Sequence, residues 1–224
     1  MHIVNNLSGT CFQNGYNIVN HRGTAIIGMS PGNSYFKQDT VQTLLEYSAQ
    51  LFSHIIIMIP DTPAVHTYKA MGYESIKAER IARHAGSLLR RRSQASIDTI
   101  KANNSMCDIT ILNWAADIEP DYYYLSQKEA IYDLYERNQQ FRHDVRSTTQ
   151  EVIAAHLKHG NDLEHSCDQG VHYLLEELAF LTAWPLLVKQ PITYVYHNRW
   201  PVWEKFINGD YDGIEKELGF TLIK

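Results

Sequence analysis

Two short runs of β-branched residues stand out in the hydrophobic pattern of the first part of the chain. TAIIG (24–28) and HIIIMI (54–59) are bounded by glycine, serine and proline, which is typical of buried strands. The segment between them, 40–53, has apolar residues at close to helical spacing. The pattern therefore predicts a strand, a helix and a second strand, joined in a right-handed crossover unit.

The rest of the chain continues to alternate between strand-like and helix-like patterns. Strand-like runs occupy 106–114 and 191–197, and longer helical patterns occupy 75–104, 121–158 and 168–182. Such alternation favours a mostly parallel sheet covered on both faces, so we expect an α/β fold with a Rossmann-like sheet flanked by helices. Because no repeat or low-complexity linker divides the chain, we expect a single α/β domain over residues 1–224.

Residues that can do chemistry follow the predicted strands. Ser30 comes just after the first strand and Asp61 just after the second, whereas Tyr196 and His197 close the run at 191–197. Ligands of open α/β sheets bind beyond the carboxyl ends of the strands. We therefore expect these side chains to share one edge of the sheet.

Ser30 lies in AIIGMSPGNSYF (25–36), where Gly28, Ser30 and Gly32 have the G-x-S-x-G spacing of a hydrolase nucleophile elbow. The order of elements does not suit that fold, because the spacing closes the first strand, Pro31 follows the serine and no histidine is evident as a general base. Serine, proline, glycine and asparagine are also turn formers. The pattern alone leaves a nucleophile and a turn serine both open.

Two further segments carry candidate polar groups. In VHYLLEELAFL (171–181), Tyr173 and Glu177 are four residues apart and project from one face of a helix. A carboxyl group at the edge of a core could hold an ammonium group or exchange a proton with it, whereas on a surface the two would form an ordinary pair. In YVYHNRWP (194–201), Tyr196 ends a strand-like run, where a phenol could relay protons.

The most unusual segment is the helical pattern from Ser75 to Arg92. It contains six basic residues against one acid, Glu79, in a chain whose net charge is −5. Its cationic face could be an ordinary solvated face, but the missing acids favour binding to a phosphate backbone. At ~100° per residue, its apolar arc consists of Ile81, Ala85, Leu88 and Leu89. Its basic residues are Lys77, Arg80, Arg83, Arg90, Arg91 and Arg92.

Composition narrows the class of protein. The 224 residues are 44% hydrophobic and 20% charged, as in globular proteins, and the net charge of −5 argues against generalised binding to nucleic acid, although the charge is unevenly distributed. No apolar run approaches the ~20 residues of a membrane span, and no secretory signal is evident. Cys11, Cys107 and Cys167 are widely spaced and form no C-x-x-C pair, so we expect reduced thiols, no metal site and a cytoplasmic location.

Taken together, the motifs resemble those of the cyclodipeptide synthases. The segment GMSPGNSYF, the arginine-rich helix, Y-x-x-x-E and YH with a proline four residues after the histidine occur in the order and spacing of that family. The resemblance covers about residues 20 to 202, and the combination is specific although no single piece is. Asn33, Tyr196 and His197 also resemble the residues that mark one subfamily.

The resemblance implies a fold similar to the catalytic domain of class I aminoacyl-tRNA synthetases, with no ATP site and no cofactor. It implies that two aminoacyl-tRNAs are joined into a cyclic dipeptide. Ser30 would be the nucleophile, Tyr173 and Glu177 would hold the amino group, Glu177 would also transfer a proton, and Tyr196 would act in cyclisation. The basic helix would bind tRNA. Further substrate-binding residues would be Gly28, Asn33, Tyr124 and His197.

Some points of the resemblance are incomplete. The register of Tyr124 among three consecutive tyrosines is uncertain, and Ala155 stands where the family often has a helix asparagine, with Asn161 too far along the chain. The alternatives are a serine hydrolase, which would not need the cationic helix, and a non-catalytic RNA-binding protein, which would not need the serine. We expect a monomer without membrane or DNA partners; the sequence does not identify the two amino acids.

Overall fold

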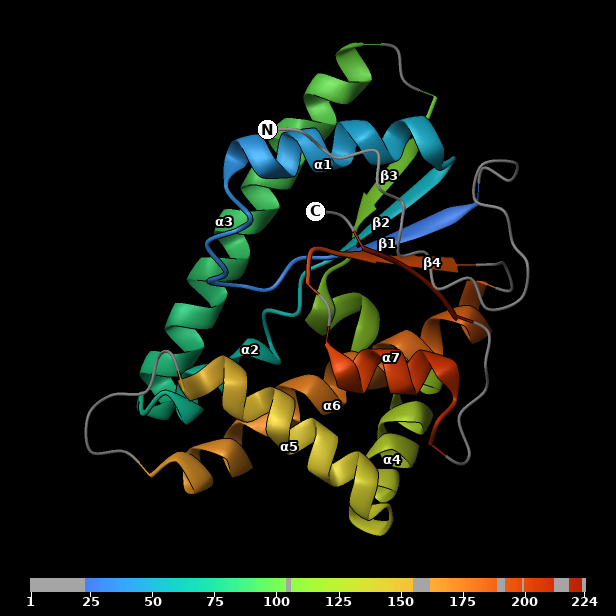
Figure 1. Cartoon of the computed structure of the whole chain (residues 1–224). Helices are drawn as coiled ribbons and strands as arrows, with labels where there is room; N and C mark the ends of the chain where they lie inside the picture. Colours follow the sequence, from blue (N-terminus) through green and yellow to red (C-terminus); the bar gives the residue numbers. More distant parts are fainter. Residues whose placement is uncertain are drawn as a thin grey trace.

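The computed structural model describes residues 23–103, 106–154, 162–188, 192–198, 200–211 and 218–222. Within these residues, five strands form one parallel sheet in the order β3-β2-β1-β4-β5 (Figure 1). β1, the first of the strands in the described residues, is therefore central in the sheet. The strands are β1 (Thr24–Gly28), β2 (His54–Met58), β3 (Asp108–Ile111), β4 (Ile192–Tyr196) and β5 (Leu218–Leu222).

Helices cover both faces of the sheet (Figure 1). On one face lie α1 (Gln38–Leu51) and the long α3 (Ser75–Ala102). The other face of the sheet is covered mainly by α4 (Tyr122–Arg137), α5 (Gln139–Ala154), α6 (Leu163–Val188) and α7 (Pro201–Asn208), with α2 (Ala64–Ala70) packed against α6. No helix among the described residues is long and apolar enough to cross a membrane.

The two faces of β1 belong to two separate cores. Ala25 and Ile27 pack on the side of α1 and α3, whereas Ile26 packs on the side of α4, α6 and α7. Every residue of β1 is buried, which explains why its sequence is continuously apolar and does not alternate with polar residues. The predicted mostly parallel sheet, flanked by helices, is confirmed.

Some elements differ from the sequence pattern. The predicted helix 121–158 is two helices, α4 and α5, because Asn138 has an extended backbone and its side-chain oxygen accepts a hydrogen bond from the amide of Phe141. α2, α7, β5 and a π-helical turn (Trp114–Ile118) were not predicted. Three residues of the sequence analysis lie outside the described residues: Cys11, Ala155 and Asn161.

The buried stripe of α3 differs from the predicted arc. It contains Ala78, Ala82, Gly86 and Leu89, whereas Ile81, Ala85 and Leu88 are only partly buried. Because these side chains are small, α3 lies close to the segment that follows β2. The residues of α3 that come nearest to that segment are therefore small ones and not the most hydrophobic ones. A Cβ atom at position 86 would overlap the Cβ atom of Asp61 and lie 3.0 Å from its Oδ2. Periodicity located the helix but not its contact face.

We expect Gly86→Ala to lower the free energy of unfolding by about 1–3 kcal/mol, as overpacking does. Alanine inside a helix is normally favoured over glycine by about 1 kcal/mol. A decrease in the free energy of unfolding would therefore indicate the steric overlap. Asp61 cannot easily move away, since its Oδ2 lies 2.5 Å from Nη2 of Arg90.

Chemical denaturation measures this effect, and Ser87→Ala is the control. Ser87 is the next residue of α3 and is exposed, so its replacement should change stability by less than about 0.5 kcal/mol. A Gly86→Ala protein as stable as the wild type would contradict the close packing of α3 on Asp61.

Candidate active site

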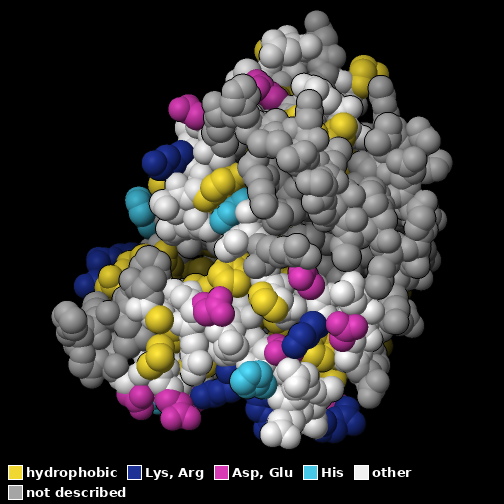
Figure 2. Space-filling model, viewed as in Figure 1, with side chains coloured by type: hydrophobic (Ala, Val, Ile, Leu, Met, Phe, Trp, Pro, Cys, Tyr) yellow, Lys and Arg dark blue, Asp and Glu magenta, His cyan; other side chains and the backbone are white. Residues whose placement is uncertain are grey.

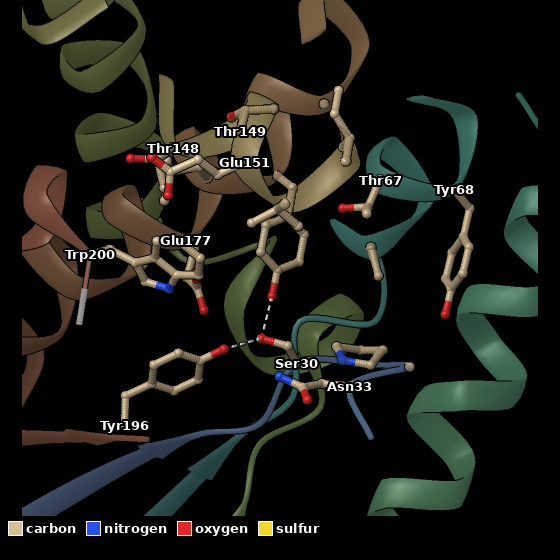
Figure 3. Close-up of a pocket in the computed structure, with 18 of the residues that line it drawn as sticks. Ser30, Asn33, Thr67, Tyr68, Thr148, Thr149, Glu151, Glu177, Tyr196 and Trp200 are labelled. Carbon is tan, nitrogen blue, oxygen red and sulfur yellow. Dashed lines mark hydrogen bonds between the residues drawn. The ribbon is translucent and has the colours of Figure 1, made fainter. Parts of the chain in front are cut away.

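Ser30 lies at the carboxyl edge of the sheet, in the turn that follows β1. The turn is closed by a hydrogen bond from the amide of Asn33 to the carbonyl oxygen of Ser30, at 3.2 Å. Gly32 has φ of +82°, a conformation that L side chains rarely adopt, so glycine is needed there. Gly32 therefore shapes a turn that presents Ser30 to the cavity (Figure 3).

Two phenols bind the hydroxyl of Ser30. The hydroxyl of Tyr173, from α6, donates to Ser30 Oγ at 3.1 Å, and the Tyr196 hydroxyl, from β4, lies 2.9 Å from the same atom (Figure 3). Among the described residues, no histidine makes a hydrogen bond to Ser30. The partner that a Ser–His hydrolase needs is therefore replaced by phenols.

Burial raises the pKa of both phenols above the ordinary value for tyrosine. Tyr173 and Tyr196 are therefore protonated near neutral pH and cannot act as strong bases toward Ser30. They can fix the direction of the Ser30 hydroxyl and pass protons along the chain of three hydroxyl groups.

Asn33 and His197 stabilise the Ser30 turn through side-chain contacts. The amide nitrogen Nδ2 of Asn33 lies 3.0 Å from Nε2 of His197, and the Asn33 side-chain oxygen accepts from the backbone amide of Tyr35 at 2.9 Å. The ring of Tyr35 stacks on His197 with centroids 4.0 Å apart. Burial lowers the pKa of His197, which suits a neutral ring that accepts the Asn33 hydrogen bond.

Glu177 is the buried carboxyl group of the site. It is 6% exposed and lies one helical turn after Tyr173 on α6, where it lines the same cavity as Ser30. Burial raises the pKa of Glu177 to about 8, while a hydrogen bond from the hydroxyl of Tyr194, 3.5 Å from Oε1, acts in the opposite direction. A carboxyl group with such a pKa can both bind an ammonium group and exchange a proton near neutral pH.

Glu176, the preceding residue, has the opposite environment. Lys128 Nζ lies 2.7 Å and His66 Nε2 lies 3.6 Å from its Oε1. Burial alone would raise the pKa of Glu176, but hydrogen bonds with His66 and Lys128 outweigh burial and lower it. Glu176 therefore joins α6 to α2 and α4 and does not take part in the site.

A cavity of about 580 Å³ opens above Ser30. Its walls come from the Ser30 turn, α2, α5, α6, β4 and the start of α7, and are mostly apolar and aromatic. Thr148, Thr149 and Glu151 of α5 lie across the cavity from Ser30, and Trp200 lies near Glu177 (Figure 3). The cavity is of the size usual for small-molecule sites.

The predicted site residues divide into two groups. Ser30, Asn33, Tyr173, Glu177 and Tyr196 line the cavity together. Gly28, Tyr124 and His197 are not among its lining residues.

Each of the three residues outside the cavity wall has another position. Tyr124 packs edge-on against Trp114 in the core and is 1% exposed. Its buried hydroxyl has no hydrogen-bond partner among the described residues. Gly28 lies under the hydroxyl of Tyr194, and His197 supports Asn33.

Sequence reasoning missed several lining residues. Thr67 and Tyr68 come from α2, a short helix without a distinctive pattern, and Thr148 and Glu151 are polar positions in an ordinary amphipathic helix. Only their nearness to Ser30 in space marks these four residues. Trp200 and Trp203 also line the cavity, and for them the aromatic pair in WPVW (200–203) was a signal in the sequence.

The cations of α3 also divide into two groups. Arg90 binds Asp61 at 2.5 Å, and Nη1 of Arg92 donates to the carbonyl oxygen of Phe36 at 2.6 Å, so these two side chains are engaged within the protein. Figure 2 shows Lys and Arg side chains on the flank where α3 lies. Within the predicted basic segment 75–92, the exposed cations are Lys77, Arg80, Arg83 and Arg91.

Comparison with known proteins identifies one family. A family model described as "Cyclodipeptide synthase" matches residues 9–223. A cyclo(L-leucyl-L-leucyl) synthase of Photorhabdus laumondii is 26% identical over 199 residues, which cover 84% of this chain and 82% of that protein.

Solved structures share the fold. A cyclodipeptide synthase from Bacillus thermoamylovorans has a TM-score of 0.79 at 20% identity, over 92% of this chain and 90% of that one. A Mycobacterium tuberculosis protein, whose structure relates cyclodipeptide synthetases to type I tRNA synthetases, has a TM-score of 0.72 at 17% identity, over 92% and 87%. The expected likeness to the class I synthetase fold is confirmed.

We expect the two neighbouring glutamates to differ in their effect on stability. Native Glu177 retains its proton up to a pKa of about 8, whereas the unfolded chain loses it near the ordinary value. Stability is therefore lost as the pH rises toward 8. Glu177→Gln, which cannot ionise, should have nearly the wild-type melting temperature at pH 5 but exceed it by at least about 4 °C at pH 8.5.

Glu176→Gln is the matched comparison, measured in the same thermal melts. It removes a buried charge that Lys128 and His66 contact, so it should lower the melting temperature at pH 7. If Glu177→Gln melted below the wild type at pH 8.5, the buried, proton-retaining carboxyl would be the wrong description.

Proposed function

This chain belongs to the cyclodipeptide synthase family, and we propose that its reaction runs through an aminoacyl ester on Ser30. Enzymes of the family make cyclic dipeptides from aminoacyl-tRNAs. The proposal is supported above all by one observation: the Ser30 hydroxyl, bonded to two protonated phenols, opens into a cavity that also contains the Glu177 carboxyl.

In the first step, Ser30 Oγ attacks the ester carbonyl of an aminoacyl-tRNA. The bond from that carbonyl to the ribose oxygen breaks, and the ribose oxygen leaves with the proton of Ser30. One ester replaces another, so no ATP is needed, and the product is an acyl-enzyme. The phenols of Tyr173 and Tyr196 orient the attacking oxygen by hydrogen bonds. Burial raises their pKa values, so they keep their protons and do not serve as bases.

In the second step, the amine of the Ser30-bound residue attacks the ester of a second aminoacyl-tRNA. Tyr173 and Glu177 hold this amino group, and Glu177 accepts the proton that the amine loses as the peptide bond forms. The bond from the carbonyl of that ester to the ribose oxygen breaks, the ribose oxygen leaves on the second tRNA with the proton that Glu177 passes on, and a dipeptide remains on Ser30. A carboxyl group with a pKa near 8 is suited to take up and release that proton.

In the third step, the free amine of the dipeptide attacks its own ester on Ser30. The ring closes, the bond to Ser30 Oγ breaks and the proton returns to that oxygen. Tyr196 contacts the leaving oxygen at 2.9 Å and can relay the proton. The mostly apolar cavity keeps water from the ester, so acyl groups pass to amines in preference to hydrolysis.

The aminoacyl groups are proposed to be apolar. Met71, Val152, Ile153 and Leu174 line the cavity beside the aromatic rings, and the relative from Photorhabdus laumondii is named for cyclo(L-leucyl-L-leucyl). We propose that the exposed cations of segment 75–92 of α3 bind the phosphate backbone of the first tRNA; they are Lys77, Arg80, Arg83 and Arg91. A monomer in the cytoplasm would suffice for this scheme.

Expression in a bacterial host should release a diketopiperazine into the medium, where mass spectrometry detects and identifies it. Ser30→Ala should lower product formation at least about 10³-fold, as the loss of a nucleophile does. Ser34→Ala is the control: this serine also lines the cavity but is exposed and makes no hydrogen bond to the two phenols, so product should be retained. Product formation by the Ser30→Ala protein at the wild-type rate would rule out the acyl-enzyme.

Replacement of Arg80, Arg83 or Arg91 by Gln should raise KM for aminoacyl-tRNA without changing the melting temperature. Each replacement should also flatten the slope of log(kcat/KM) against log salt by about 0.7–0.9, the value for one phosphate contact. Arg92→Gln is the contrast, because it removes a bond to Phe36 and should affect stability and kcat more than the salt slope. Wild-type slopes in all three surface variants would exclude this face as the tRNA site.

A further inference from the structure

Tyr194 is a buried phenol beside the site that the proposed mechanism does not use. It precedes Tyr196 by two residues in β4, so both side chains point to the same face of the sheet. Its ring stacks on Trp203, with centroids 5.1 Å apart and planes 5° apart, and lies 6.3 Å from the ring of Tyr196. Only 2% of Tyr194 is exposed, and two aromatic neighbours fix its ring.

The hydroxyl of Tyr194 lies between β1 and α6. On one side it donates to Oε1 of Glu177 at 3.5 Å. On the other side it fills the space above Gly28, where a Cβ atom would overlap the hydroxyl and lie 3.3 Å from Cε2 of the ring. The β1–β4 register, which pairs Ile26 with Tyr194, sets this contact. Gly28 is therefore needed for the Tyr194 hydroxyl to reach Glu177.

We propose that Tyr194 is a positioning residue, which holds the carboxyl group of Glu177 toward the ester on Ser30, and that Gly28 leaves the space for its hydroxyl. The inference rests on the proposed function, because it concerns how Glu177 is placed to hold the amino group. Phenylalanine would fill the same volume and stack equally well on Trp203. The hydroxyl is thus the part of Tyr194 that packing alone does not explain.

The hydrogen bond has a chemical consequence for Glu177. Burial favours the protonated carboxyl, and donation from Tyr194 favours the ionised one, which is the form that binds an ammonium group and accepts a proton. The other titratable groups that line the same cavity are Tyr68 on α2, Glu151 on α5, Tyr173 on α6 and Tyr196 on β4. Burial raises the pKa of all three phenols, so they keep their protons between pH 6 and 9.

The neighbouring acid does not compete for this role. Glu176 is engaged with Lys128 and His66. Among the described residues, the hydrogen bond from Tyr194 is the interaction that lowers the pKa of Glu177. Loss of this bond should therefore raise the pKa of Glu177 and also leave its carboxyl less well directed.

The test is Tyr194→Phe, which removes the hydroxyl and keeps the ring. The midpoint of the acidic limb of kcat should move up by about half to one pH unit, as expected for one hydrogen bond to a carboxylate. This predicts a fall in kcat of about threefold to tenfold at pH 7 and of less than about twofold at pH 9. KM for aminoacyl-tRNA and the melting temperature should change little. Titration of the Glu177 carboxyl by carbon-13 NMR, assigned with Glu177→Gln, should show the same displacement.

Tyr211→Phe is the matched control. Tyr211 is also 2% exposed and its hydroxyl also donates to a carboxylate, Asp144 Oδ2 at 2.7 Å. This variant loses an equivalent bond elsewhere, so it should leave the pH profile unchanged. The role of Gly28 is tested by stability: Gly28→Ala should cost less in a Tyr194→Leu protein, where the overlap is gone, than in the wild type.

The outcomes separate the inference from the proposed function. A wild-type pH profile and NMR titration in Tyr194→Phe would overturn the inference, while the loss of product in Ser30→Ala and Glu177→Gln would still support the mechanism. Undiminished product in Ser30→Ala and Glu177→Gln would instead overturn the mechanism. An equal cost of Gly28→Ala in both backgrounds would overturn the role assigned to Gly28.

Discussion

The hydrogen bonds between Ser30 and two partly buried phenols depend on the whole architecture. Tyr196 and Tyr173 are 166 and 143 residues away from Ser30 in the chain, so no local structure could bring them together. The sheet order does so, because it places β4 directly beside β1. α6 then packs across the same face and brings Tyr173 within 3.1 Å of the serine. The site exists only when the long-range strand pairing is complete.

The same helix serves the fold and the chemistry with adjacent residues. On α6, Glu176 points to Lys128 and His66 and joins neighbouring helices, while Glu177 lines a mostly apolar cavity and retains its proton. The two carboxyl groups are chemically identical, and only the direction of the side chain distinguishes them. The helix that carries both keeps the Glu177 carboxyl group in the cavity although its burial is unfavourable to stability.

The sequence predicted the parts of this structure that depend on local pattern. The strands of β1 and β2 are continuous apolar runs, and their ends located Ser30 correctly. The contact face of α3 could not be found in this way, because Gly86 and its neighbouring alanines are buried for their small size and not for hydrophobicity. Tyr124 is a similar case, since its burial in the core depends on Trp114.

The arginines of α3 show a related limit of sequence reasoning and have a consequence for protein engineering. Arg91 faces solvent, but Arg92, its neighbour, donates a hydrogen bond to the carbonyl oxygen of Phe36, in the segment that follows β1 and contains Ser30. Gln38, which begins α1, donates in return to the carbonyl oxygen of Arg92. The cationic helix and the Ser30 segment are therefore coupled: a chimera that takes α3 from a relative must take the segment after β1 with it.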